Sequence, residues 1–229
     1  MIPKKIHYCW FGGNPLTELA IKCIESWRKF LPDYEIIEWN EQNYDVHKIP
    51  YISQAYDAKK YAFVSDYARF DTDVEVIKSL EDIIEQGNFA GVESPGKIAA
   101  GLGLASSEMC PIYKEILDSY NKSSFITTNG QIDLTTVVTR VSDIFKKHGF
   151  TDENRIQIIE NVTIYPSEYF CPKDYKTGVI KITDNTYSIH HYDASWTSVA
   201  QRKYDSIRRK NYETSRKEER LGGYICRRK

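Results

Sequence analysis

Within the first forty residues, the pattern of hydrophobic and polar positions changes from that of a strand to that of a helix and back again. Residues 5–10 form a short strand-like run that ends at a glycine pair, and residues 34–39 form a second one. Between them, apolar residues recur at the three-and-four spacing of a helix with one buried face: Leu16, Leu19, Ala20, Cys23, Ile24, Trp27 and Leu31. Pro32 ends this helix. Strand, helix and strand in this order predict a parallel α/β layer.

The remaining pattern continues the alternation of strands and helices. Asp133 is predicted to cap a helix, and Gly149 stands where a C-cap glycine would end it. The apolar stripe of this helix is Leu134, Val137, Val138, Val141, Ile144 and Phe145. The other predicted helices cover residues 51–70, 79–85 and 111–120, and the predicted strands cover 74–77, 89–92, 98–105, 156–159, 162–165, 179–182 and 187–190. The fold class is therefore α/β, with a mixed central sheet flanked by helices, as one domain over residues 1–200. A C-terminal tail, residues 201–229, is expected to be helical.

The amino-acid composition limits the classes of protein to which the chain can belong. The chain has 229 residues, 41% hydrophobic and 28% charged, which is typical of a globular domain. No window approaches eighteen consecutive apolar residues, and the N-terminus has no apolar segment of signal-peptide length. Five cysteines without a CxxC pair favour a reducing, cytoplasmic location and argue against a zinc site.

Charge is unevenly distributed along the chain. The net charge is −1, yet residues 201–229 carry eleven basic and four acidic residues. An acidic body with a basic tail is not the pattern of a nucleic-acid-binding protein. The tail is either a solvated, frayed helix or a peripheral contact with anionic lipid at the inner face of the membrane.

The sharpest local feature is the pair of carboxylates Asp71 and Asp73. Two hard oxygen ligands at this spacing suit Mg²⁺ or Mn²⁺, although the same pair is common in solvated turns. Asp66 and Arg69 lie just upstream, three residues apart on one helix face. They are either a surface ion pair or a carboxylate for sugar hydroxyls beside a donor for phosphate.

Two further stretches carry candidate binding residues. Tyr8, Trp10 and Phe11 stand at the carboxyl end of the first strand, where α/β sheets bind ligands, and are either base-stacking residues or core. Near the C-terminus, His190 and His191 are adjacent in a strand, so at most one of them faces a metal.

In this order the stretches IPKKIHYCWFGG, SDYAR, DTDVEV, LTTVVTRVSDI and IHHYDASW resemble glycosyltransferase family 32, the DXD sugar-binding family of bacterial capsular-polysaccharide type. The resemblance implies a GT-A-like nucleotide-sugar-binding fold, Mn²⁺ or Mg²⁺ as cofactor, and retaining transfer of a hexose. The donor expected at family level is UDP-galactose or UDP-glucose, and the acceptor is a glycan or a lipid-linked glycan.

Site residues carry over by matching position. The resemblance implies that Asp73 is the principal metal ligand, with Asp71 toward the ribose or sugar and His191 as a further ligand. The remaining implied donor contacts are Tyr8, Trp10 and Phe11 at the nucleobase, Asp66 and Arg69 at the sugar and phosphates, Ser195 and Trp196 over the diphosphate, and Asn129 in a donor- or acceptor-facing loop.

One departure from the family pattern leaves alternatives open. Family members place a longer segment, ending in a Gly-Gly turn and an apolar strand, between the SDxxR helix and the DxD pair. Here Arg69 and Phe70 run straight into Asp71. The alternatives are a non-catalytic nucleotide- or sugar-binding relative, disabled by the shortened segment, and a phosphohydrolase that uses the same acidic pair for metal.

Overall fold

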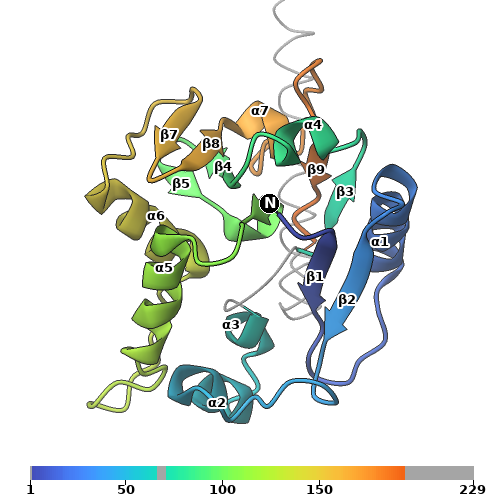
Figure 1. The fold of residues 1–229 in the computed structure, drawn as a ribbon. Coiled ribbons are helices and arrows are strands. Elements are labelled where there is room, and N and C mark those ends of the chain that lie inside the picture. The colour runs from blue at the N-terminus through green and yellow to red at the C-terminus, as the bar shows by residue number, and fades with distance from the viewer. Residues whose placement is uncertain (1, 66–70, 194–229) are drawn as a thin grey trace, which may run out of the picture.

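The first strand–helix–strand unit forms as predicted (Figure 1). The computed structural model describes residues 2–65 and 71–193, and here β1 (Lys5–Cys9) pairs in parallel with β2 (Glu35–Trp39). The connecting helix α1 (Glu18–Phe30) starts at Thr17, whose side chain accepts a hydrogen bond from the Ala20 N–H. Ala20, Cys23, Ile24 and Trp27 of the predicted stripe are buried, while Leu19 is partly exposed. The predictions for Asp66, Arg69, Ser195, Trp196 and residues 201–229 lie outside the described residues.

A mixed sheet is built around β4 (Phe89–Ser94). This strand pairs in parallel with β8 (Val162–Tyr165) and antiparallel with the short strands β5 (Lys97–Ile98) and β6 (Leu104–Ala105). The edge strand β7 (Gln157–Ile159) pairs antiparallel with β8. Strand β4 is buried over most of its length, which suits its apolar sequence.

A third pair of strands joins distant parts of the chain. Strand β3 (Val74–Val76) pairs antiparallel with β9 (Ser188–His190), and Val74 stands opposite His190. The buried Trp27 of α1 donates its indole N–H to the Val74 carbonyl oxygen at 2.8 Å. The described strands therefore form three hydrogen-bonded groups rather than one continuous central sheet.

The other helices surround these strands. In Figure 1, α2 and α3 lie beyond the carboxyl ends of β1 and β2, and α5 and α6 lie on the side away from α1. Within residues 2–65 and 71–193, no helix combines the length and hydropathy of a bilayer-spanning segment. The bounds are α2 Pro50–Asp57, α3 Tyr61–Ser65, α4 Glu81–Ile84, the 3₁₀ helix η1 Ala100–Leu102, α5 Pro111–Asn121, α6 Val137–Lys147 and α7 Ser167–Phe170.

The predicted helix at Asp133 begins later than expected. Thr136, not Asp133, is the N-cap of α6, because its hydroxyl accepts a hydrogen bond from the Thr139 N–H. The Asp133 carboxylate instead accepts from the Thr135 N–H, and Leu134, counted in the stripe, is 70% exposed. Gly149 does follow the helix with a left-handed φ of 97°.

Three other element predictions are corrected. The predicted helix over 51–70 breaks after α2, where Lys59 has a left-handed φ of 57°. The predicted strand over 98–105 is interrupted by η1. The predicted strand over 179–182 is a single bridge between Lys173 and Ile180, because the chain there follows a tight turn.

Candidate functional site

Asp71 is held against the backbone of η1. Its N–H donates to the Gly101 carbonyl oxygen at 2.9 Å, and its own carbonyl oxygen accepts from the Val74 N–H at 3.0 Å. The Asp71 carboxylate lies so close to Gly101 that a Cβ there would be 1.9 Å from Oδ2. Only a residue without a side chain permits this position. The sequence analysis missed Gly101, and the signal available for it was the run of small residues Ala99-Ala100-Gly101.

His190 reaches the same place from the end of β9. Because β9 pairs antiparallel with β3, the His190 imidazole faces the turn that precedes β3, and its Nε2 lies 3.3 Å from Asp73 Oδ1. One ligand atom each from Asp71, Asp73 and His190 lies within 4.8 Å of the others. Two carboxylate oxygens and one imidazole nitrogen form a set that can hold Mn²⁺ or Mg²⁺.

The electrostatics of His190 reflect these neighbours. Burial lowers its pKa, but Asp73, Cys171 and Asp71 outweigh burial and raise the pKa to about 10. Its Nδ1 is buried and has no hydrogen-bond partner among the described residues. The nitrogen that faces the carboxylates is Nε2, which carries a proton at neutral pH when the pKa is about 10, so a cation bound there would displace that proton.

His191, predicted as a further metal ligand, faces the other side of the strand. The structure does not place it beside Asp71 and Asp73. Its Nε2 lies 2.8 Å from Glu75 Oε2, and Lys22 donates to the same oxygen at 2.8 Å. Burial raises the pKa of Glu75, but the hydrogen bonds to Lys22 and His191 outweigh it and hold the pKa below its usual value. The adjacent histidines do face opposite sides, and the one beside the carboxylates is His190.

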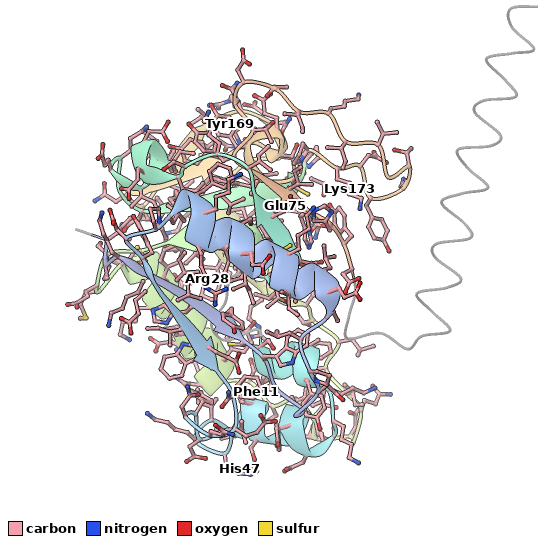
Figure 2. The ribbon with its side chains drawn as sticks, turned by 90° about the vertical axis from the view of Figure 1, so that its right-hand side faces the viewer. Phe11, Arg28, His47, Glu75, Tyr169 and Lys173 are labelled. Carbon is pink, nitrogen blue, oxygen red and sulfur yellow. The ribbon has the colours of Figure 1, made fainter. Side chains whose placement is uncertain are left out.

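The segment after β9 is tied to this cluster. The Asp193 N–H donates to Asp73 Oδ2 at 2.8 Å, and the His191 N–H donates to the Asp73 carbonyl oxygen at 2.9 Å. Lys173 donates to the His191 carbonyl oxygen at 2.7 Å. Figure 2 shows Glu75 and Lys173 next to each other, above α1 in that view. Asp73 is therefore fixed by backbone as well as by His190.

A cavity of about 490 Å³ opens at the carboxyl ends of β1 and β2. Trp10, directly after β1, lines it and donates its indole N–H to the Asn14 carbonyl oxygen at 2.6 Å. Glu41 Oε1 accepts from the Gly12 N–H at 2.7 Å and from the Tyr56 hydroxyl at 3.1 Å. The described lining, which contains no Lys or Arg, is Trp10, Gly12, Gly13, Asn14, Glu38, Asn40, Glu41, Gln42, Tyr56 and Tyr61.

Tyr8 and Phe11, predicted as donor contacts beside Trp10, are core residues instead. The Tyr8 ring is buried edge-on against Trp27, and its hydroxyl donates to Glu38. The Phe11 ring is buried against Tyr44. Neither ring offers a face to a ligand, so the core interpretation of these two aromatics holds.

Asn129 lies in an exposed turn rather than at the carboxylate cluster. Its side-chain oxygen accepts a hydrogen bond from the Thr127 hydroxyl. The same loop is attached to α2 through a hydrogen bond from the Ile126 N–H to Gln54 Oε1. Among the described residues, the side-chain hydrogen bonds of this turn join Thr127, Asn129 and Gln131 to one another and not to Asp71, Asp73 or His190.

Comparison with known proteins finds likeness at the level of structure only. No protein-family model matches the chain, and no curated protein sequence matches it. Among solved structures, the chain is similar to one named "PaToxG Glycosyltransferase", with 15% identity and a TM-score of 0.48. The likeness covers 64% of this chain and 69% of that chain.

Proposed function

We propose that the protein is a metal-dependent glycosyltransferase that moves a hexose from a nucleotide sugar to a glycan or lipid-linked acceptor. The observation that carries the proposal is the convergence of Asp71, Asp73 and His190, which come from two segments more than a hundred residues apart. The motif resemblance adds the expected donor, UDP-galactose or UDP-glucose. It also adds a role in capsular or surface polysaccharide synthesis, with a cytoplasmic enzyme working at the inner face of the membrane.

The three side chains fit a divalent cation. The carboxylate oxygens of Asp71 and Asp73 are hard donors, and His190 Nε2 lies 3.3 Å from Asp73 Oδ1. When bound, Mn²⁺ or Mg²⁺ supplies positive charge beside the departing diphosphate. Asp73 and His190 would hold it, and Gly101 keeps the Asp71 carboxylate in place.

The cavity suits the uncharged end of the donor. Its described lining offers the Trp10 and Tyr56 rings and the Glu41 carboxylate, which favour a nucleobase and ribose hydroxyls over phosphate. In this proposal the diphosphate binds to the cation held at Asp73. Asp66, Arg69, Ser195 and Trp196 stay predicted contacts for the sugar and diphosphate.

The proposed chemistry is substitution at the anomeric carbon. A bond forms between the acceptor hydroxyl oxygen and this carbon, the bond to the phosphate oxygen breaks, and the nucleoside diphosphate leaves with the electron pair. The proton of the acceptor hydroxyl passes to the departing phosphate oxygen. We assign no residue of the described ranges 2–65 and 71–193 as the nucleophile of a covalent intermediate, and we propose attack by the acceptor from the face of departure, with retained configuration. NMR of the product tests this step, and an inverted anomer would exclude it.

The experiment that tests the site is thermal unfolding with UDP, with and without Mn²⁺. A ligand at about one hundred times its dissociation constant adds about 2.7 kcal/mol of stability. We expect the shift to need both UDP and Mn²⁺, to disappear in His190→Ala, and to persist in the neighbouring control His191→Ala. A shift that survives in His190→Ala and Asp73→Asn would overturn the site.

A non-catalytic nucleotide- or sugar-binding protein is the second candidate. The observation in its favour is the direct junction of Phe70 and Asp71, where the family has a longer segment. Binding of UDP with Mn²⁺, without transfer or hydrolysis of UDP-sugars, would support this candidate. Mn²⁺-dependent turnover in protein of verified mass would exclude it.

A further inference from the structure

A hairpin between α7 and β9 projects apolar side chains into solvent. Its turn is closed by hydrogen bonds from the Asp174 N–H to the Val179 carbonyl oxygen and from the Gly178 N–H to the Asp174 carbonyl oxygen. Gly178 has a left-handed φ of 72°, and Lys173 bridges to Ile180. We call residues 173–182 the apolar hairpin. Its hydrogen bonds define a turn, so its side chains are presented in a fixed arrangement.

Four large apolar side chains are exposed within eight residues of this hairpin. The exposed fractions are 48% for Tyr175, 42% for Val179, 41% for Ile180 and 60% for Ile182. Single exposed apolar residues are ordinary on protein surfaces, but a run of them marks an interaction surface. Among the described residues, about half of the surface of each of these side chains stays exposed, so packing of the described core does not account for them.

Lysines alternate with these apolar residues. Lys176 and Lys181 are exposed, and Lys173 is a third cation at the base. Asp174 is the single acidic residue of the hairpin, and its carboxylate accepts from the Thr177 N–H at 2.7 Å, within the turn. The apolar hairpin therefore has a net positive charge among exposed aliphatic groups.

The apolar hairpin is attached to the carboxylate cluster. Lys173 donates to the His191 carbonyl oxygen at 2.7 Å, next to Glu75 in Figure 2. The Tyr175 ring packs edge-on against Tyr192 at 5.1 Å, and Tyr192 contacts the His190 ring at 4.2 Å. A surface that engages the hairpin therefore lies beside Asp73 and His190.

We propose that the apolar hairpin docks on an anionic lipid bilayer. Val179, Ile180 and Ile182 would leave water for the boundary of the acyl chains, and Tyr175 suits the headgroup level. Lys176 and Lys181 would approach lipid phosphates while their stems follow the apolar surface. Interleaved cations and aliphatic side chains fit this occupant better than an apolar protein groove, which would leave the lysines unpaired.

A fluorescent probe at the hairpin tests the proposal on the full chain. Ile180→Cys is labelled with an environment-sensitive dye and mixed with vesicles of phosphatidylcholine with or without phosphatidylglycerol. We expect brighter, blue-shifted emission with the anionic vesicles. The control is Ile158→Cys on the edge strand β7, an aliphatic position that is more exposed than Ile180 and should not respond. Wild-type protein taken through the same labelling corrects for native thiols.

Vesicle affinity separates the hairpin from the basic tail. Val179→Ser/Ile180→Ser/Ile182→Ser should weaken binding to anionic vesicles by about tenfold or more. The control Ile156→Ser/Ile158→Ser should bind as wild type. Because all these side chains are exposed, thermal unfolding should stay unchanged.

Three results would each overturn the proposal. In the first, anionic vesicles bind the protein while the dye at position 180 does not respond, which assigns binding to residues 201–229. In the second, no vesicle binds. In the third, the dye responds to protein concentration without vesicles, which assigns the surface to a second copy of the chain. None of these readouts depends on glycosyl transfer.

Discussion

The carboxylate of Asp71 rests against the α-carbon of Gly101, where a Cβ would lie 1.9 Å from Oδ2 and 2.3 Å from Cγ. The Asp71 N–H also donates to the Gly101 carbonyl oxygen. Gly101 therefore acts through Asp71 and is a positioning residue for the proposed cation site. A glycine is needed at position 101 because the Asp71 carboxylate fills the space of a Cβ, and not because a turn requires a left-handed backbone there.

Replacement of Gly101 by alanine should displace Asp71 and weaken Mn²⁺ binding. The atom that must move is the end of a short side chain, so we expect a stability loss of only about 1–2 kcal/mol. The affinity for Mn²⁺ should decrease by about tenfold or more, measured by titration of the thermal shift.

Gly130→Ala is the matched control for this change. Gly130 lies in the exposed turn beside Asn129 with a φ of 79° and open space around it, so alanine adds backbone strain of about 1–2 kcal/mol without touching Asp71. An equal loss of Mn²⁺ affinity in both variants would contradict the positioning role of Gly101.

Trp27→Phe should lower the free energy of unfolding by about 2–3 kcal/mol. The variant leaves the Val74 carbonyl oxygen without its indole donor and opens space in a fully buried site. Urea unfolding followed by circular dichroism gives this value. Trp39→Phe is the comparison, because its indole donates to His7 at a partly exposed position and should cost less. Equal costs for both variants would show that the bond to Val74 contributes little.

Trp10→Ala should weaken binding of UDP by about tenfold, while binding of Mn²⁺ alone stays unchanged. Base stacking on an aromatic ring contributes about 1–3 kcal/mol, and Trp10 is a partly exposed ring in the cavity. Calorimetric titration with UDP measures the change. Tyr34→Ala removes a ring just before the amino end of β2, opposite the cavity, and should bind UDP as wild type. Unchanged UDP binding in Trp10→Ala would show that the nucleobase does not stack on Trp10.

His148 should stabilise the protein in a pH-dependent way. Hydrogen bonds to Glu115 and Glu160 raise the pKa of His148 above the ordinary value of a histidine. A raised pKa in the folded state adds stability that is fully present below the unfolded pKa and is lost as pH rises through the folded value. The melting temperature of wild type minus that of His148→Gln should therefore be larger at about pH 6 than at about pH 9. A difference in melting temperature that increases with pH would show that protonated His148 does not stabilise the folded protein.

Local periodicity predicted the elements that depend on neighbours in the chain. The unit β1–α1–β2 follows from one buried helix face between two short apolar runs, and the structure confirms its parallel pairing. The start of α6 was misplaced because Asp133 and Thr136 are both good N-caps, and the choice between them depends on which turn buries Val137. Such competition between equivalent local signals is not visible in sequence.

The sequence by itself determined the two carboxylates, their hard-ligand chemistry, and the rule that only one of two adjacent histidines can face them. Tertiary structure decided that this histidine is His190, because the antiparallel register of β3 and β9 sets its side chain beside Asp73. It also decided that Tyr8 and Phe11 are buried while Trp10 lines the cavity, and that Gly101 makes room for Asp71. The physical reason is common to these cases. Each depends on the meeting of segments far apart in the chain, and periodicity describes one segment at a time.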